Sequence, residues 1–231
     1  GNSTYSNLLA EYTVNYKKTH SQTLLPMLDE IANMTELDLT TIDAIAIAAG
    51  PGSFTGLRIG SATAKGLGLA LKKPLIAIPT VDALAYNLYG TDRLICPIMD
   101  ARRNQVYTGI YEFRGNTMEV LESQMAVDIE VIAEKLCERQ QDVIFLGDGV
   151  PVFKDKSCNG LMDKLHDCGK EFYFAPAHVN KQRAGAVGAL ALRYLEEGKT
   201  ETAEEHQPEY LRMAQAERER AEKLAKGEGT C

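Results

Sequence analysis

The run Gly-Pro-Gly-Ser-Phe-Thr-Gly-Leu-Arg-Ile-Gly, from Gly50 to Gly60, is the feature that most constrains how this chain folds. An apolar segment, residues 42–49, leads into it, and a segment rich in small residues follows. This order predicts a strand, a tight glycine turn and a helix start, the junction at which α/β proteins often bind ligands. The run lacks the Lys-Ser/Thr pair of a P-loop, and Ser53 does not stand in a Gly-x-Ser-x-Gly elbow. We therefore predict a structural turn, with anion contact as the alternative.

The helix predicted after this turn, to about residue 71, carries small residues at every fourth position. One stripe consists of Gly56, Gly60, Ala64 and Gly68, and a second, beside it, of Ala62, Gly66 and Ala70. A glycine inside a helix costs roughly 1 kcal/mol relative to alanine, so close packing has to offset several such residues. The pattern allows two interpretations, packing within the chain or a helix bundle with another subunit.

Apolar runs and helical patterns alternate along the first part of the chain. Residues 8–16 and 42–49 are predicted strands, and between them Leu24, Leu28 and Ile31 share one face of an amphipathic helix. Pro26 is expected in the first turn of that helix. Residues 75–78 and 94–99 are further strands around a short helix, 81–89. Such alternation predicts a mostly parallel sheet.

The pattern changes after Asp100. Residues 105–113 and 118–125 are predicted to form a hairpin, followed by a helix (128–140), two short strands (143–146 and 172–174) and a helix (184–197). We place a domain boundary there, giving domains 1–100 and 101–231. A charged, helix-prone segment is expected at about 210–226.

Composition excludes several classes of protein. A net charge of −7 argues against a stand-alone nucleic-acid binder. Five scattered cysteines without a Cys-x-x-Cys spacing predict no disulfide framework, no zinc site and a reducing compartment. The four histidines are isolated, which favours surface or capping positions over a metal site. No apolar run is long enough to span a membrane, and we expect a cytoplasmic protein.

The chain resembles the TsaB (YeaZ-type) family. The residues that carry the resemblance are Thr19-His20-Ser21, Leu24-Leu25-Pro26, the Gly50–Gly60 run, Ala64-Lys65-Gly66-Leu67, Asp100-Ala101-Arg102-Arg103 with Val106-Tyr107, and Pro208-Glu209-Tyr210-Leu211-Arg212 with Gln215-Ala216-Glu217-Arg218. The resemblance implies an α/β, actin/hexokinase-like (ribonuclease H-like) fold of two related domains. This family normally begins with an apolar strand and a hairpin that the sequence lacks, so we expect an incomplete first sheet and a truncated chain.

The resemblance also implies a function. The chain would be a non-catalytic accessory subunit required for threonylcarbamoyladenosine modification of tRNA next to the anticodon. It would bind a TsaD-type catalytic subunit that carries the ATP and metal chemistry, together with a TsaE-type P-loop ATPase. It would bind no cofactor or metal alone. The net charge predicts that it touches tRNA only through the complex, and the smooth face of the helix after the glycine turn predicts a homodimer in isolation.

Under this resemblance the intersubunit interpretation of the small-residue stripe is preferred. The residues expected to bind the partner are Leu24, Leu28, Ile31, Gly56, Gly60, Ala64 and Gly68. The alternative function is a peptidase of the glycoprotease type, although no nucleophile–base arrangement or metal pair supports it. A small ATPase or sugar kinase is disfavoured, because Arg102 and Arg103 follow Asp100 where a nucleotide-binding hairpin would carry glycine.

Overall fold

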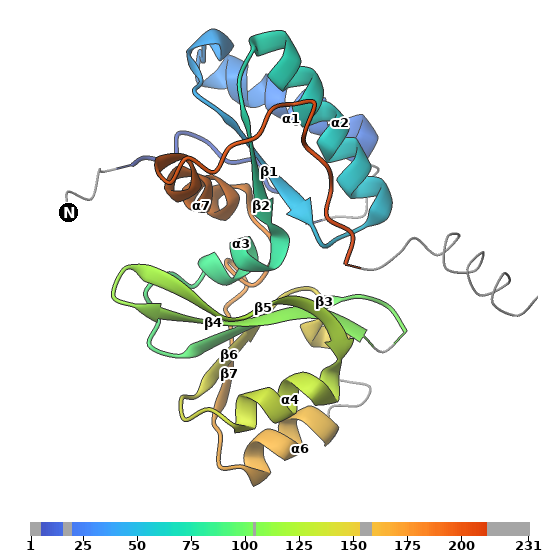
Figure 1. Cartoon of the computed structure of the whole chain (residues 1–231), viewed down its shortest axis with the longest axis vertical. Helices are drawn as coiled ribbons and strands as arrows, with labels where there is room; N and C mark the ends of the chain where they lie inside the picture. The colour runs from blue at the N-terminus through green and yellow to red at the C-terminus, as the bar shows by residue number, and fades with distance from the viewer. Residues whose placement is uncertain (1–5, 16–19, 104, 153–158, 212–231) are drawn as a thin grey trace, which may run out of the picture.

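The computed structural model describes residues 6–15, 20–103, 105–152 and 159–211, and shows two α/β lobes stacked on one another (Figure 1). The first lobe contains a parallel pair of strands, β1 (Ile45–Gly50) and β2 (Leu75–Pro79). The second contains a five-stranded sheet of order β5-β4-β3-β6-β7. Helix α3 (Thr80–Tyr86) lies between the lobes (Figure 1).

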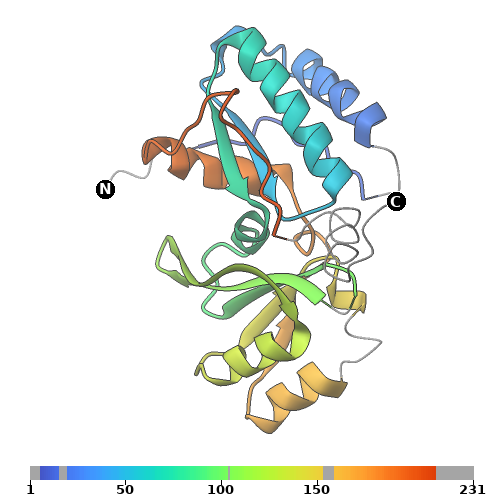
Figure 2. The ribbon, with the colours of Figure 1, turned by 45° about the vertical axis from the view of Figure 1, so that its right-hand side comes forward.

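Helices cover both faces of the sheet in the first lobe. Ile45 and Ile47 face α2 (Phe54–Leu71), whereas Ala44 and Ala46 face α7 (Ala184–Glu196), as the alternation of side chains along a strand requires. Helix α1 (His20–Met34) lies alongside α2 (Figure 2) and is followed by the short 3₁₀ helix η1 (Leu39–Thr41). Among the described residues β1 pairs with β2 alone.

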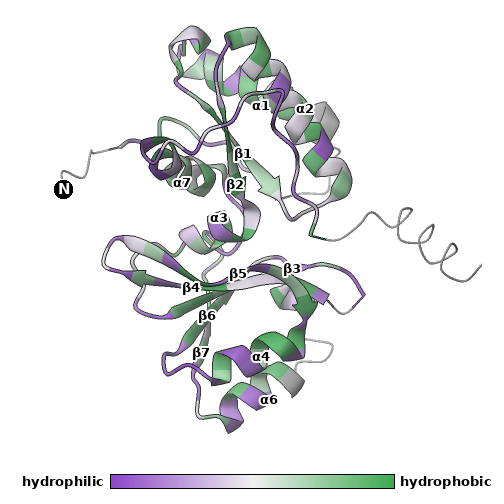
Figure 3. Cartoon of the chain, viewed as in Figure 1, coloured by the Kyte–Doolittle hydropathy of each residue, from purple (hydrophilic) through white to green (hydrophobic). Residues whose placement is uncertain are grey.

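The second lobe is built on β3 (Leu94–Asp100), β4 (Gln105–Arg114), β5 (Thr117–Asp128), β6 (Val143–Leu146) and β7 (Phe172–Phe174). Strands β3, β4 and β5 run antiparallel, and β6 and β7 run parallel to β3. Helices α4 (Ile129–Cys137) and α6 (Asn159–Asp167) pack on one face of this sheet. In Figure 3 the strands are largely hydrophobic, and hydrophilic residues gather on the loops and on the outward sides of α4 and α6.

Most predicted elements are confirmed, and the chain has the α/β fold that the sequence predicts. The predicted strands 143–146 and 172–174 match β6 and β7. The two lobes are not separated by a single point in the sequence near residue 100, where the domain boundary was predicted. Strand β3 precedes that boundary and lies in the second lobe, while α7 follows it and packs in the first. The predicted charged helix at 210–226 falls, beyond residue 211, outside the described residues.

Two local predictions are wrong. Residues 8–15 form no strand, and Leu9 and Tyr12 are exposed. A strand needs a neighbour for its backbone groups, and alternation of side chains does not supply one. Glu11 instead accepts hydrogen bonds from Arg183 and from the Gly185 amide at the start of α7. Helix α1 begins at His20, so Pro26 lies beyond the first turn and removes an internal backbone donor.

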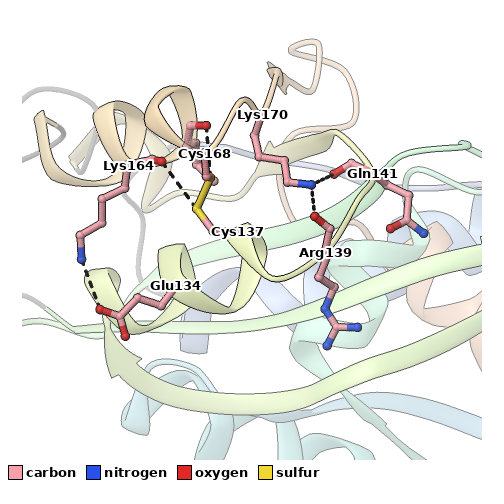
Figure 4. The surroundings of a disulfide bond; sticks show 8 residues. Glu134, Cys137, Arg139, Gln141, Lys164, Cys168 and Lys170 are labelled. Carbon is pink, nitrogen blue, oxygen red and sulfur yellow. Dashed lines mark hydrogen bonds and ion pairs between the residues drawn. A yellow bond between two sulfur atoms is a disulfide. The ribbon is translucent and has the colours of Figure 1, made fainter.

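The predicted absence of a disulfide framework missed one disulfide bond. Cys137 and Cys168 are 31 residues apart in the sequence and are joined by a disulfide (Figure 4). They meet because α4 and α6 lie next to one another, and each cysteine stands at the end of one of these helices. Cys96 is a free, fully buried thiol in β3.

Candidate partner-binding surface

The glycine run forms the turn between β1 and α2, and internal contacts explain its composition. Gly50 has φ +131°, a conformation that favours glycine, and a Cβ at this position would overlap the carbonyl group of Glu209. Ser53 caps α2, because its hydroxyl oxygen accepts a hydrogen bond from the Gly56 amide at 3.4 Å. The structure thus gives the run a role as a turn and helix cap.

The first small-residue stripe faces the interior of its own lobe. Ala64 and Gly68 are buried. A Cβ on Gly68 would lie 3.1 Å from the Leu75 side chain and 3.4 Å from that of Ala203, and one on Gly60 would lie 3.6 Å from the Ile47 side chain. Small residues therefore let α2 approach the β1–β2 sheet closely. Of the predicted partner-binding residues, Gly60, Ala64 and Gly68 make intrachain contacts, which is the first of the two interpretations that the sequence allowed.

The remaining predicted partner-binding residues differ in exposure. Leu24, Ile31 and Gly56 are half-buried, and among the described residues a Cβ on Gly56 would contact the Ser53 side chain at 3.5 Å. Leu28 is exposed on α1. Of the predicted set, Leu28 has the exposed side chain, and the half-buried residues are only partly accessible to another protein.

The second stripe, Ala62, Gly66 and Ala70, is exposed. Within the part of the chain that the structure describes, no atom lies within 4 Å of a Cβ built on Gly66, apart from the backbone of its own helix and its chain neighbours. Leu69 next to it is 56% exposed, as is Leu25 on α1. We call the exposed set Leu25, Leu28, Ala62, Gly66, Leu69 and Ala70 the α1–α2 surface. Large exposed apolar side chains on neighbouring helices are typical of a contact surface.

A segment in which no helix or strand was predicted before residue 210 holds this lobe together. Residues 199–211, here called the C-terminal strap, run from α7 past β2 towards the end of β1 (Figure 1). Glu201 exchanges two backbone hydrogen bonds with Leu75, and the Glu209 amide donates to the Ala49 carbonyl at 2.7 Å. The Tyr210 and Phe54 rings lie 5.2 Å apart. Glu209 and Tyr210 of the strap and the Gly50–Gly60 run, which are far apart in the sequence, thus meet in the structure.

One histidine of the strap corrects the prediction of surface or capping positions. His206 is fully buried, and its Nδ1 lies 2.6 Å from the Glu201 carboxylate oxygen Oε1. Its Nε2 has no hydrogen-bond partner in the part of the chain that the structure describes. The same described residues contain no group of three or more side chains that could hold a metal ion.

A buried acid joins α3 to the second lobe. The Tyr111 hydroxyl on β4 donates a 2.7 Å hydrogen bond to Asp82 on α3. Burial raises the pKa of Asp82, against the opposing effect of this hydrogen bond, and the negative charge of Glu209 adds to the rise. The pKa of Tyr111 is raised by burial and by the neighbouring carboxylate. This pair couples the position of α3 to the strand that α3 rests on.

The Asp100–Arg103 segment, which was compared with a nucleotide-binding hairpin, and a glycine turn at residues 147–149 both make internal contacts. The Arg102 amide donates to Asp100 Oδ1 at 2.8 Å, and Arg102 and Arg103 have φ values of 65° and 54°. The Gly149 amide donates to the Ile98 carbonyl at 2.9 Å, so this glycine turn packs on β3. These backbone groups stabilise the fold around the end of β3.

The two stacked lobes define an actin/hexokinase-like α/β protein, and comparisons with known proteins agree. A family model described as "TsaD: tRNA N6-adenosine threonylcarbamoyltransferase" matches residues 7–220. A crystal structure of an uncharacterized Pseudomonas aeruginosa protein with similarity to peptidase YEAZ has a TM-score of 0.68 and 26% identity, covering 84% of this chain and 85% of that chain. Among the described residues, no helix has both the length and the apolar character needed to cross a membrane.

Curated relatives narrow the class further. The chain is 34% identical over 212 residues to the tRNA threonylcarbamoyladenosine biosynthesis protein TsaB of Bacillus subtilis, which covers 91% of this chain and 87% of the relative. It is 30% identical to the Escherichia coli protein of the same name over 201 residues, and this aligned region covers 84% of this chain and 81% of the relative. The chain therefore belongs to the TsaB family.

Proposed function

We propose that this chain acts in threonylcarbamoyladenosine modification of tRNA as a non-catalytic accessory subunit. It binds a TsaD-type catalytic subunit through the α1–α2 surface. The relatives named for threonylcarbamoyladenosine biosynthesis support the process. The observation that carries the binding role is the exposure of Leu25, Leu69 and Gly66 on two neighbouring helices.

Gly66 gives the strongest physical argument. Glycine inside a helix costs about 1 kcal/mol relative to alanine, and no contact within the described residues offsets that cost at Gly66. By contrast, the tight contacts of Gly68 with Leu75 and Ala203 explain its small size. A partner helix approaching α2 closely at Ala62, Gly66 and Ala70 explains the exposed stripe in the same way.

The accessory role agrees with the contacts of the residues that an enzyme would use. Ser53, the candidate nucleophile of the peptidase alternative, caps α2 through the Gly56 amide. At the two turns, the Arg102 amide donates to the Asp100 carboxylate and the Gly149 amide donates to the Ile98 carbonyl, so these two amides already have acceptors within the chain. In our proposal the partner subunit holds the ATP and the metal.

The remaining partners follow from the same assignment. A TsaE-type P-loop ATPase joins the complex, and tRNA reaches this chain only through it, in keeping with the net charge of −7. In isolation the α1–α2 surface is covered by a second copy of the chain. The compartment is the cytoplasm, where such a tRNA-modifying complex works.

The test is complex formation with a TsaD-type subunit, measured by light scattering. Leu69→Glu and Gly66→Leu change exposed positions of α2 and should abolish the complex while circular dichroism stays unchanged. Val131→Glu is the matched control, because Val131 is 38% exposed on α4 of the other lobe. The proposal fails if both α2 variants bind like the wild type. Peptide cleavage by the purified chain that is lost in Ser53→Ala would favour the peptidase alternative.

A further inference from the structure

We propose that Cys137 and Cys168 form a reversible oxidative-modification site, at which a small-molecule disulfide such as glutathione disulfide converts two thiols into the observed bond. Cys137 is the last residue of α4, and Cys168 follows the last residue of α6. Their Cα atoms are 5.9 Å apart, inside the range that a disulfide spans without backbone movement. Figure 4 shows both side chains between the two helix ends.

The surroundings hold the two sulfur atoms together independently of the bond. Leu161 and Leu165 of α6 are buried in the same cluster as Leu136 of α4. The Lys164 ammonium lies 3.4 Å from the Glu134 carboxylate, and the Lys170 ammonium donates to the Arg139 and Gln141 carbonyl groups (Figure 4). Reduction therefore leaves α4 and α6 in place, with the two thiols adjacent and ready to be oxidised again.

Accessibility selects this pair over the other described cysteine. Cys168 is exposed and Cys137 is half-buried, so an external disulfide reaches Cys168 first. Cys96 is fully buried beside Thr108, and burial raises the pKa of its thiol to about 12. The thiolate is the reactive form, so Cys96 does not compete for the reagent.

The exchange takes place in two balanced steps. The Cys168 thiolate attacks one sulfur of the external disulfide, forms a mixed disulfide and releases one thiolate of the reagent. The Cys137 thiolate then attacks the Cys168 sulfur, forms the internal bond and releases the second thiolate. The two cysteines are oxidised by two electrons, the reagent is reduced, and the two cysteine protons end on the released thiols.

We expect formation of the disulfide to increase the stability of the second lobe and to leave that of the first lobe unchanged. Linking positions 31 residues apart restricts the unfolded chain, and the native contacts between α4 and α6 stay as they are. The α1–α2 surface belongs to the other lobe, so oxidation leaves partner binding unchanged. The inference therefore stands or falls separately from the proposed function.

The experiment treats the reduced full-length chain with a series of glutathione to glutathione-disulfide ratios, blocks free thiols by alkylation and maps peptides by mass spectrometry. We expect a peptide linking Cys137 to Cys168 that increases with the oxidised ratio and disappears after dithiothreitol. Oxidation should raise the thermal midpoint by roughly 10 °C. Cys168→Ser should abolish both effects, and Cys96→Ser should retain them.

Three results would overturn the proposal. In the first, Cys137 and Cys168 remain free and are alkylated at every glutathione ratio. In the second, the linked peptide contains Cys158 in place of Cys137 or Cys168, and loss of that peptide in Cys158→Ser would verify this result. The third is a bond that dithiothreitol does not reduce in the folded protein.

Discussion

Replacing Gly66 by alanine should make the isolated chain more stable. Gly66 lies inside α2 and is exposed. Among the residues that the structure describes, a Cβ there would be at least 4 Å from any atom outside its own helix backbone and chain neighbours. The methyl group therefore adds helix propensity without a clash, and we expect a gain of about 0.5–1 kcal/mol in the free energy of unfolding. For a chain of this size that gain raises the thermal midpoint by roughly 1–4 °C.

Gly68→Ala is the matched variant two residues along the same helix. Its Cβ would lie 3.1 Å from both the Leu75 side chain and the Lys73 carbonyl oxygen. The close contacts should cancel the gain in propensity, so that this variant is less stable than the wild type. Urea unfolding followed by circular dichroism compares the two. Our assignment of an inner and an outer stripe is refuted if Gly66→Ala destabilises the chain or if Gly68→Ala stabilises it equally.

Two further predictions concern the strap and the buried acid. Gly50→Ala should lower the free energy of unfolding, measured in urea, by about 2–4 kcal/mol, because Gly50 has a φ of +131° and a Cβ there would overlap the Glu209 carbonyl. Gly115→Ala, in an open hairpin turn, is the control and should lower it far less. Equal losses in the two variants would contradict the packing of the strap on Gly50. The raised pKa of Asp82 means that its contribution to stability is present below its unfolded pKa and is lost as pH rises through the folded value. The free energy of unfolding of Asp82→Asn, relative to that of the wild type, should therefore increase as pH rises from 4 to 7. A difference between the two proteins that does not change with pH would contradict this prediction.

The elements that sequence reasoning predicted well are those in which local signals determine structure. Residues 143–146 and 172–174 are short apolar runs between polar segments, and each is a strand of the second sheet. Residues 50–53 combine glycines with a capping serine, and a turn and helix start are found there. In these places the neighbours in the sequence already provide the turn, the cap or the buried face.

The parts that sequence reasoning missed depend on contacts between distant segments. Alternation in residues 8–15 could not show whether a neighbouring strand exists, and the strap is recognisable only once Glu209 is seen against Ala49. Helix α6 was not predicted, so the proximity of Cys137 and Cys168 could not be anticipated. The small residues at every fourth position of α2 revealed two stripes in the sequence. The contacts of Gly68 with Leu75 and Ala203 are needed to show which stripe faces inward.

Amide hydrogen exchange of this chain, with and without a TsaD-type subunit, is the most direct test of the proposed interface. The account predicts that partner binding protects amides in α1 and α2, residues 20–34 and 54–71, and leaves α4 and α6 unchanged. Protection concentrated in the second lobe, or a stable complex with no change in α1 and α2, would contradict it.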